Sequence, residues 1–525
     1  MLAHVAALLV SASAASGASA VTFAAAVPSG KALAQLAASE EALVALTGHA
    51  RAARLVRSRG GRLLSARLRL WKLSGAAAAR LVPELERLGA LRYAEPSRRR
   101  DTLVRFTDPL STPDLSYHLP AIGADRSEPP GRGFPITILD SGIDLSHPDF
   151  AARPDIVLLN PQLVSGPDRD DYHGTEVASM AAAAVNGVGG EGVYPQALVR
   201  SYDVRDELDD DAVVAGIEAA LAAGPSVINL SLGGTEPSRS LFEATLLALA
   251  AGSLVVAASG NELDVGNPTL YPAAFPHVLT VGASNRQSLP TVFSSSGPTV
   301  DLTAPGEELP FQNPRDPSNH YLLAGTSFSA PLVSAAAAWV RTVRGAMTIG
   351  QLANLLRFSA RDVGEPGFDE RTGYGVLDIP AALAAPLPPR DAQEPNDDVS
   401  HVVAGGLFAR AKPFVSARFQ AVLDETEDPR DVYRVSVPAG RRLTVRVVAD
   451  DDVRVALFGP TARTVLGTRS RLAVADRAGR QPETVTSANR TGRSLVLFLA
   501  VSPGRARTIA NPSYRVELTF ASAPR

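Results

Sequence analysis

Four polar residues of this chain carry side chains that suit acyl-transfer chemistry, and Ser327 is the first of them. It lies in the run GTSFSAP (residues 325–331), directly before an Ala-rich segment, residues 332–341, that we expect to be helical. The first N–H groups of a helix are unpaired and the dipole is positive there, so an oxyanion beside Ser327 would be stabilised. Serine is also a favoured N-cap, and this run alone does not separate a nucleophile from a cap.

A serine hydroxyl is a weak nucleophile unless a neighbouring base takes its proton and a third group orients that base. Asp140 follows the apolar strand expected at residues 136–139 and precedes a turn, which places its carboxylate at the carboxyl edge of a sheet. His173 precedes an Ala-rich helix expected at residues 176–185, and Asn261 follows another apolar strand. Each residue is ordinary when taken singly, but the order Asp, His, Asn, Ser predicts a hydrolytic site.

This constellation resembles that of the subtilases, the subtilisin-like serine proteases, over residues 135–382. The resemblance implies that Ser327 attacks the scissile carbonyl, that His173 transfers the proton and that Asp140 orients His173. Asn261 and the backbone N–H of Ser327 would bind the oxyanion. The intervals of 33 and 154 residues along Asp140, His173 and Ser327 agree with the family. The matching motifs are DSGID (140–144), HGT (173–175), NLSLGG (229–234), GN (260–261), YPA (271–273), APG (304–306) and GTS (325–327).

The chain departs from the family pattern at three positions near these motifs. Glu176 stands where a second histidine is usual, Phe328 where a methionine follows the nucleophile, and Leu332 where a histidine follows the proline. None of the three replaces a catalytic group, so they affect the packing of helices rather than the chemistry. Phe328 also removes a thioether that oxidises readily beside a nucleophile.

Two other classes of protein use similar folds or groups. A pseudoprotease or binding scaffold would keep the fold and lose the chemistry, and the intact set of four residues argues against it. An esterase or amidase would usually carry a Gly-x-Ser-x-Gly elbow, which is absent around Ser327. We therefore expect a serine endopeptidase that needs no catalytic cofactor and acts on protein or peptide substrates.

The composition is that of a multidomain globular protein: 525 residues, 45% hydrophobic and 20% charged. The absence of cysteine excludes disulfides and thiolate chemistry. Residues 1–20 hold an apolar run and end in Ala-Ser-Ala, which predicts a signal peptide and secretion to the extracellular space or periplasm, although the usual basic residues are missing. The alternative is an Ala-rich leader. No other apolar run is long enough for a membrane span.

Residues 27–105 are strongly basic, with 16 Lys and Arg against 6 Asp and Glu. Their pattern of strand, helix, two strands, helix and strand predicts a ferredoxin-like unit. The unit resembles a subtilase propeptide, which implies a chaperone and inhibitor whose tail lies in the active site. A basic RNA-binding module is the competing interpretation. The strands lack an aromatic pair for base stacking, and we therefore expect no nucleic-acid partner.

The remainder divides into a catalytic region, residues 106–385, a Pro-rich linker, residues 386–392, and a C-terminal domain, residues 393–525. Alternating apolar strands and Ala-rich helices predict an α/β fold, a parallel sheet with helices on both faces, for the catalytic region. A period of two in the C-terminal domain predicts a β-sandwich. With EPND (residues 394–397) at its head, this domain resembles accessory domains of secreted bacterial peptidases, which assist export, bind substrate or are cleaved off.

Calcium is the one metal that the subtilase resemblance implies, in a structural role. Asp149 and Asn186 match two ligand positions, and the carbonyl groups of Ala184, Val188 and Gly190 complete the predicted set of oxygen ligands. The alternative is that Asn186, which precedes a glycine, only forms a turn, and that Asp149 only forms a local ion pair.

Specificity is expected to depend on two features. Five carboxylates between Asp206 and Asp211 lie where subtilases border the substrate upstream of the cut, and they favour Lys or Arg there; the alternative is that they only stabilise the dipole of the following helix. The primary pocket shows no acidic wall residue, so we expect an apolar residue directly before the cut. By resemblance, the walls are Ser231, Leu232, Gly233, Ala258 and Gly260.

Overall fold

The computed structural model describes residues 30–97, 108–112, 114–151, 153, 155–161, 172–204, 209–316, 318–391, 393–403, 413–414, 418–506 and 512–523. The predicted signal peptide, the arginines at 98–100 and the acids Asp206 and Glu207 lie outside these residues. The chain divides into two compact units, residues 1–105 and residues 106–525, and each is described by itself.

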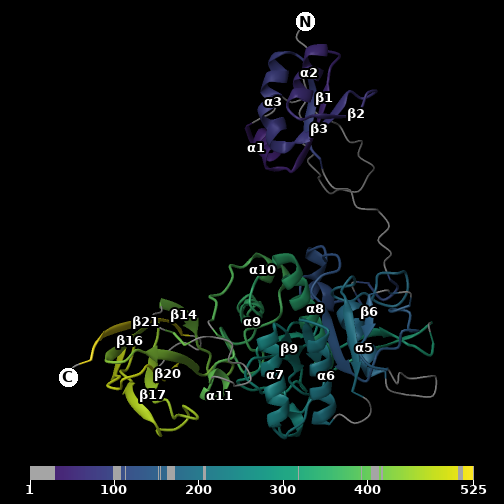
Figure 1. Ribbon diagram of the computed structural model, residues 1–525. Helices are drawn as coiled ribbons and strands as arrows, with labels where there is room; N and C mark the ends of the chain where they lie inside the picture. Colours follow the sequence, from purple (N-terminus) through teal and green to yellow (C-terminus); the bar gives the residue numbers. More distant parts are fainter. Residues whose placement is uncertain are drawn as a thin grey trace. The chain divides into compact units, whose positions relative to one another are not determined.

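The N-terminal unit is an antiparallel sheet of order β2-β3-β1-β4 with helices packed against it (Figure 1). This order and the alternation of strands and helices are those of the predicted ferredoxin-like unit. Trp71 and Leu85 are among the buried residues that form its core. The elements are α1 (Gly30–Ala38), β1 (Glu41–Leu46), α2 (Ala50–Ser58), β2 (Arg62–Ser65), β3 (Leu70–Ser74), α3 (Gly75–Arg87) and β4 (Leu91–Pro96).

The catalytic region contains a seven-stranded sheet in which every paired strand is parallel. Its four central strands are wholly buried and largely apolar, as expected of a sheet covered on both faces, whereas the edge strand at residues 156–158 has no buried residue. In spatial order they are β11 (Leu302–Pro305), β10 (Val278–Ser284), β9 (Leu254–Ala258), β8 (Val227–Leu230), β5 (Ile136–Asp140), β7 (Val199–Asp203) and β6 (Ile156–Leu158).

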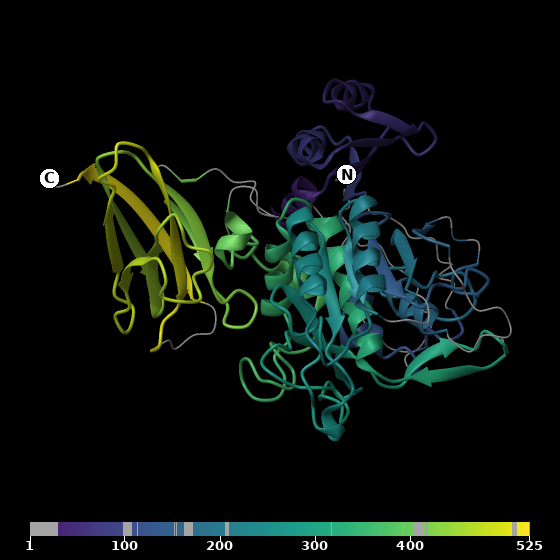
Figure 2. The same ribbon diagram turned by 60° about the horizontal axis from the view of Figure 1, so that its bottom comes forward.

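Helices cover this sheet on its two faces (Figures 1 and 2). Helices α5 (His173–Ala182) and α8 (Thr326–Arg344) contribute to one hydrophobic core, and α6 (Asp210–Ala222) and α7 (Arg239–Ala251) contribute to another. The alanines of α8 are fully buried, so this helix packs closely against the strands. The predicted α/β class is therefore confirmed.

Two helix boundaries differ from the sequence-based expectation in ways that matter for the site. Helix α8 begins at Thr326, so Ser327 is its second residue rather than its cap. Helix α5 begins at His173 and ends at Ala182, whereas we expected residues 176–185. Both helices start earlier than expected because their first turns contain polar and glycine residues, which do not show the apolar pattern although most of them are buried.

The remaining elements of the catalytic region connect the sheet to its surroundings. The hairpin of β12 and β13 is antiparallel, and α9 begins with a complete capping box between Thr348 and Gln351. These elements are α4 (His118–Ala121), η1 (Ala124–Arg126), η2 (Leu263–Val265), β12 (Leu309–Gln312), β13 (His320–Leu323), α9 (Ile349–Phe358) and α10 (Ile379–Ala384).

The C-terminal domain is a β-sandwich of two four-stranded sheets, with strand orders β14-β21-β16-β19 and β15-β20-β17-β18. Inward-facing Val, Leu and Tyr residues of both sheets form one core. Its elements are α11 (Val399–Val402), β14 (Arg418–Val422), β15 (Asp431–Val437), β16 (Arg441–Ala449), β17 (Val453–Phe458), β18 (Arg471–Ala475), β19 (Glu483–Ala488), β20 (Leu495–Pro503) and β21 (Ser513–Ser522). Among the described residues, no helix is both long and apolar enough to cross a bilayer.

Candidate active site

Asp140 and His173 are joined by a hydrogen bond at the carboxyl edge of the parallel sheet. Asp140 is the last residue of β5 and is buried, and its Oδ1 lies 2.8 Å from Nδ1 of His173. The same oxygen accepts the N–H of Ser141 at 2.8 Å. Because Nδ1 faces the carboxylate, Nε2 is the nitrogen available to a nucleophile.

The start of helix α5 is fixed against the end of β5 by a close backbone approach. The N–H of Gly174 donates to Oγ of Ser141 at 3.0 Å, and a Cβ atom on Gly174 would lie 2.3 Å from the carbonyl oxygen of Gly142. No side chain other than hydrogen fits at that distance. The glycine after His173 therefore lets the imidazole reach Asp140.

Ser327 lies in the first turn of α8, in the same cleft as Asp140 and His173. Its N-cap residue is Gly325, which has φ +147° and supplies no side-chain cap. The hydroxyl of Ser327 donates to the carbonyl oxygen of Ser231 at 3.4 Å, a long hydrogen bond that leaves the oxygen accessible. The cleft has a volume of about 420 Å³ and is lined by Asp140, His173, Asn261 and Ser327.

Asn261 is oriented by a hydrogen bond through its carbonyl oxygen. Oδ1 accepts the N–H of Thr326 at 2.9 Å and the hydroxyl of Thr326 at 3.1 Å. The amide N–H₂ is the donor end that remains for the cleft, beside the N–H of Ser327. Two such donors next to a nucleophile are what an oxyanion requires.

A buried chain of hydrogen bonds, which the sequence did not indicate, holds the backbone of Ser327. Ser334 in α8 donates to Oδ1 of Asn229 at 2.9 Å, and Nδ2 of Asn229 donates to Oγ of Ser231 at 3.0 Å. Ser231 then donates to the carbonyl oxygen of Ser327 at 2.7 Å. Asn229 is fully buried in β8, so it ties the sheet to the helix that carries the nucleophile.

We expect Asn229→Ala to lower both stability and turnover. The change leaves the buried hydroxyl of Ser334 without its acceptor and removes the donor to Ser231, at a cost of about 1–3 kcal/mol, and it loosens the position of Ser327. Thermal unfolding and kcat measured on the same preparation test this. Ser334→Ala, which removes one bond of the chain and leaves Ser231 held, should have the smaller effect on kcat. Equal turnover of Asn229→Ala and the parent enzyme would contradict the positioning role.

The predicted walls of the primary pocket lie together around this cleft. Ser231, Leu232, Gly233, Ala258 and Gly260 all line it, and so do Leu270 and Glu262, which sequence reasoning missed. The predicted walls themselves contain no acidic residue, but Glu262 beside them brings a carboxylate to the cleft. Glu262 directly follows Asn261, and its Oε2 accepts the N–H of Asn261 at 2.6 Å. This hydrogen bond helps to hold Asn261, the proposed oxyanion donor, in place.

The three departures from the family pattern are accommodated by packing. The ring of Phe328 lies 5.7 Å from that of His173, measured between centroids, and Leu332 is fully buried in the core. The carboxylate of Glu176 accepts a short hydrogen bond from the hydroxyl of Tyr321 in β13. Burial and this carboxylate raise the pKa of Tyr321 above its ordinary value. Glu176 therefore connects the histidine helix to the β12–β13 hairpin.

The predicted calcium ligands lie on a loop that wraps around two buried carboxylates. Asp149 accepts the hydroxyl of Ser179 at 2.7 Å and the N–H of Gly190 at 3.3 Å, and Asn186 donates to the carbonyl oxygen of Pro148. The second carboxylate, which sequence reasoning missed, belongs to Asp108 and accepts the backbone N–H groups of Asn186 and Gly187.

These residues fit a hard cation such as calcium. Oδ2 of Asp108 is buried and has no hydrogen-bond partner among the described residues. Burial is the main cause that raises the pKa of Asp108, and the nearby charge of Asp149 adds to it. Burial likewise raises the pKa of Asp149. Carboxylate oxygens such as those of these two buried side chains are ligands that calcium prefers.

We expect a calcium chelator to lower the melting temperature of inhibited mature enzyme. An ion present at about 100 times its Kd stabilises by about 2.7 kcal/mol. The measurement compares the parent with Asp149→Asn, for which the chelator should have a smaller effect. If the chelator lowered the melting temperature of both proteins equally, this loop would not be a calcium site.

The acidic segment before α6 is described only in part. Asp210 and Asp211 lie in the first turn of α6, and Asp209 is its N-cap residue without a side-chain cap bond. We expected the helix to begin near Ala212, so two of the five carboxylates belong to the helix itself, where they stabilise its dipole. A role in substrate recognition stays a prediction.

Asp140, His173, Asn261 and Ser327 line one cleft of an α/β fold, an arrangement suited to hydrolysis, and comparisons with known proteins give the family. The model of the subtilase family matches residues 131–375. Subtilisin DY of Bacillus licheniformis is 34% identical over 280 residues, which are 51% of this chain and 98% of that protein. The chain therefore belongs to the subtilase family of subtilisin-like serine endopeptidases, which confirms the resemblance.

Longer relatives match over a smaller share of their length. Subtilisin E of Bacillus subtilis (strain 168) is 33% identical over 258 residues, 48% of this chain and 66% of that protein, so the chain spans just under two thirds of it. Among solved structures, fervidolysin from Fervidobacterium pennivorans, a keratinolytic enzyme related to subtilisin, has a TM-score of 0.48 and 20% identity, covering 85% of this chain and 84% of that one.

Proposed function

We propose that this protein is a secreted serine endopeptidase that cleaves peptide bonds through Ser327, His173 and Asp140. The observation that carries the proposal is the 2.8 Å hydrogen bond between Asp140 and Nδ1 of His173 in the cleft that Ser327 and Asn261 also line. An oriented imidazole beside an accessible hydroxyl and two N–H donors is suited to acyl transfer.

The reaction takes place in two halves. Oγ of Ser327 attacks the substrate carbonyl carbon while Nε2 of His173 takes the hydroxyl proton, and Asp140 stabilises the imidazolium. The oxyanion is held by Nδ2 of Asn261 and the N–H of Ser327. His173 then gives its proton to the leaving amine, and the C–N bond breaks. Water, deprotonated by His173, releases the acid and returns the proton to Ser327.

We further propose that the protein is made as an inactive precursor. The basic unit of residues 27–105 acts as a propeptide and inhibitor, and the precursor cuts itself. Its net charge of +10 against −13 for the remainder favours association of the two parts. Residues 1–20 then direct export to the extracellular space or periplasm.

One experiment distinguishes this proposal from the two other classes. Purified mature protein is incubated with casein and with a nitrophenyl ester, each with and without a serine-directed fluorophosphonate. An endopeptidase degrades casein and loses this activity with the reagent. An esterase would hydrolyse the ester and leave casein intact, and a pseudoprotease would act on neither.

Specificity follows from the acids at residues 206–211. We expect cleavage to favour Lys or Arg two to four residues before the scissile bond, with each exposed pair worth at most about 1 kcal/mol, and apolar residues directly before it. Profiling a peptide library at low and high salt measures both preferences. A profile that ignores upstream basic residues at low salt would leave these acids only their role at the start of α6.

A further inference from the structure

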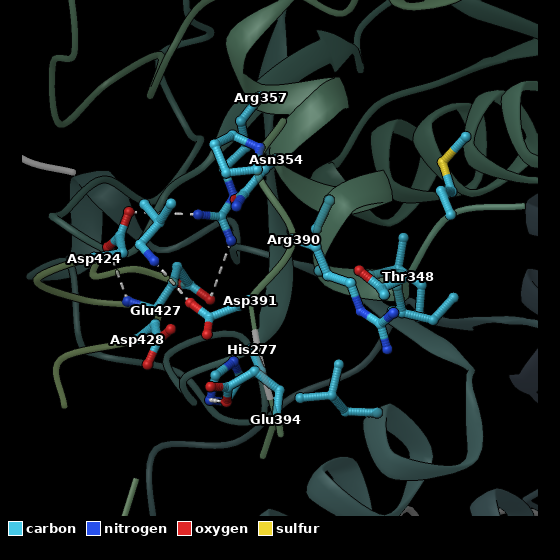
Figure 3. Close-up of a pocket in the computed structure, with 18 of the residues that line it drawn as sticks. His277, Thr348, Asn354, Arg357, Arg390, Asp391, Glu394, Asp424, Glu427 and Asp428 are labelled. Carbon is cyan, nitrogen blue, oxygen red and sulfur yellow. Dashed lines mark hydrogen bonds and ion pairs between the residues drawn. The ribbon is translucent and has the colours of Figure 1, made fainter. Parts of the chain in front are cut away.

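The junction between the catalytic region and the C-terminal sandwich contains a second cavity, of about 360 Å³ (Figure 3). On its catalytic side Arg357 of α9 is buried, with Nε 3.0 Å from Oδ1 of Asp301. The same guanidinium reaches across to the sandwich, where it lies 3.5 Å from Asp424 and 3.6 Å from Glu427. Ion pairs of one buried arginine therefore link the two domains.

A cluster of four carboxylates borders this junction and is called the junction cluster here. One oxygen of each lies within 4.8 Å of one oxygen of every other. Two belong to the segment that enters the sandwich, one to the turn before β15, and one to the first residue of β15. They are Asp391, Glu394, Asp428 and Asp431.

Several oxygens of the junction cluster are buried without a hydrogen-bond donor. Asp431 is 0% exposed; its Oδ2 accepts a short hydrogen bond from Tyr514, whereas its Oδ1 has no partner within the described chain. Oε1 of Glu394 and Oδ1 of Asp428 are likewise buried and lack a described donor. Buried carboxylate oxygens without donors are costly, because burial removes their hydration and nothing replaces it.

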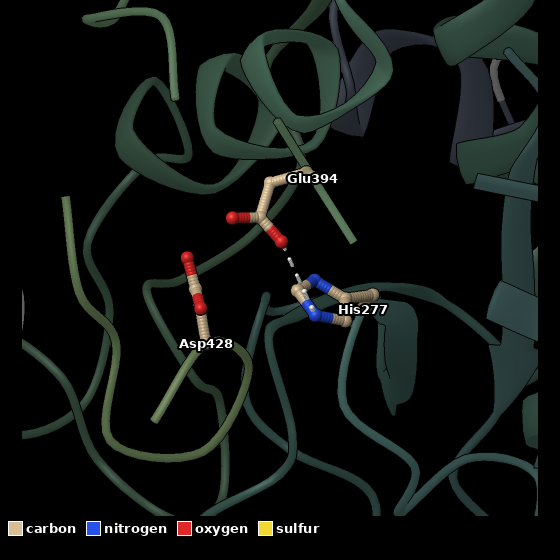
Figure 4. A group of neighbouring side chains, drawn as sticks. All are labelled: His277, Glu394 and Asp428. Atoms are coloured by element: carbon tan, nitrogen blue, oxygen red, sulfur yellow. Dashed lines mark ion pairs between the residues drawn. The ribbon is translucent and has the colours of Figure 1, made fainter. Parts of the chain in front are cut away.

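The basic side chains nearby serve other carboxylates. Among the described residues, no Lys or Arg forms an ion pair with Glu394, Asp428 or Asp431. His277 lies 3.9 Å from Glu394 (Figure 4). It lies closer, at 3.2 Å, to Asp397. Burial opposes ionisation of Asp397, yet the charge of His277 holds its pKa below the ordinary value. The imidazole of His277 is thus shared between Glu394 and Asp397.

The view of Figure 4 shows the carboxylates of Glu394 and Asp428 turned toward each other, with the His277 ring beside them. Burial is the main cause that raises the pKa of Glu394, and the charge of Asp428 adds to it. The same two causes, burial and neighbouring carboxylates, raise the pKa of Asp428.

We propose that the junction cluster binds a calcium ion. Its donors are all carboxylate oxygens, which hard divalent cations prefer. Two ligands on opposite sides of a calcium ion are about 4.6–5.2 Å apart, because each Ca–O bond is about 2.3–2.6 Å long. The four donor oxygens of the junction cluster all lie within 4.8 Å of one another, close enough to share one calcium ion.

The ion would fasten the start of the sandwich to the catalytic region. It joins the entering segment to the turn at Asp428 and to β15. The residues that contact the catalytic region lie close to these ligands in the sequence. Asp397, three residues after Glu394, pairs with His277. Glu427, directly before Asp428, pairs with Arg357. Binding would therefore order the segments that dock the accessory domain.

Calcium binding to the full chain tests this proposal without reference to activity. The protein carries Ser327→Ala, which prevents self-cleavage if the proposed protease activity is real and changes nothing if it is not. Calorimetric titration with CaCl₂ after chelator treatment and desalting is carried out on this parent and on Asp428→Asn, Glu394→Gln and Asp149→Asn. Asp476→Asn is the matched control, because Asp476 is an exposed acid of the same domain outside the cluster.

We expect Asp428→Asn and Glu394→Gln each to lose about one bound calcium per chain relative to the parent, or to bind it at least tenfold more weakly. Asp476→Asn should match the parent, and Asp149→Asn should keep the junction site. Parental stoichiometry and affinity in both cluster variants would overturn the proposal, as would a parent that binds zinc at this cluster but not calcium.

Hydrogen exchange provides a second readout that does not depend on how well a variant folds. Calcium should slow exchange in peptides that cover residues 393–398 and 424–431 of the parent at least tenfold, and it should have no such effect in Asp428→Asn. Calcium-independent exchange of these peptides in the parent would also overturn the proposal.

Discussion

Replacing Ser327 by alanine is expected to abolish casein degradation and to leave the precursor uncut. The change removes the nucleophile and keeps its helix, since alanine is the best helix former. The loss in kcat should be on the order of 10⁶, a magnitude known for subtilisin itself rather than one that follows from this geometry. Expression of the single variant, followed by mass determination of the secreted or purified product, measures both effects.

His173→Ala should have a nearly equal effect, because nucleophile and base act as one unit and their losses do not add. Thermal unfolding of both variants gives the control: a melting temperature close to that of an uncut parent separates lost chemistry from lost folding. A Ser327→Ala chain that matures when expressed alone would contradict self-processing. The endopeptidase activity would then be tested by casein degradation alone.

Asn261→Ala is expected to lower kcat by about 10²–10³ while KM changes little, again a magnitude taken from a subtilisin. The amide donates to the oxyanion that forms in the transition state and makes no comparable bond to the ground-state carbonyl. Asn261 also accepts the N–H of Thr326 at 2.9 Å, so alanine additionally loosens the start of α8.

Asn261→Asp separates these two roles of the side chain. It keeps the oxygen that accepts from Thr326 but replaces the donor with a negative charge, so its kcat should be at least as low as that of alanine. Steady-state kinetics on one peptide substrate tests the order. Higher turnover of the aspartate variant than of the alanine variant would mean that Asn261 only positions Thr326.

The residues proposed for catalysis could be placed near one another from the sequence because they follow strong local signals. Asp140 and Asn261 come after buried apolar strands of one parallel sheet, whose carboxyl ends share an edge, and Ser327 lies at the start of an Ala-rich helix. Three strands of the sandwich, β14, β18 and β19, do not follow from the sequence pattern. In β18, for example, exposed residues alternate with half-buried ones and none is fully buried. Short edge strands of this kind lack the clear apolar pattern by which a strand is recognised in a sequence.

Long-range side-chain contacts were beyond such reasoning. Arg357 and Glu427 are 70 residues apart in the sequence, and no periodicity relates them. Asp108 joins the loop at Asn186 only through tertiary folding. Asn229 was visible as part of a family motif, but its buried bonds to Ser231 and Ser334 depend on how α8 packs against β8. The residues that position the site therefore depend on specific packing, which the sequence does not show. The proposed catalytic residues could be found because strand and helix patterns mark them.

Covalent labelling of the mature protein tests the central claim most directly. A fluorophosphonate is incubated with parent and His173→Ala protein, and the labelled peptide is identified by mass spectrometry alongside residual casein activity. The account predicts one label per chain, on Ser327, with loss of activity in proportion to labelling and little labelling of His173→Ala. Labelling of a different serine, or full casein activity in protein labelled at Ser327, would contradict it.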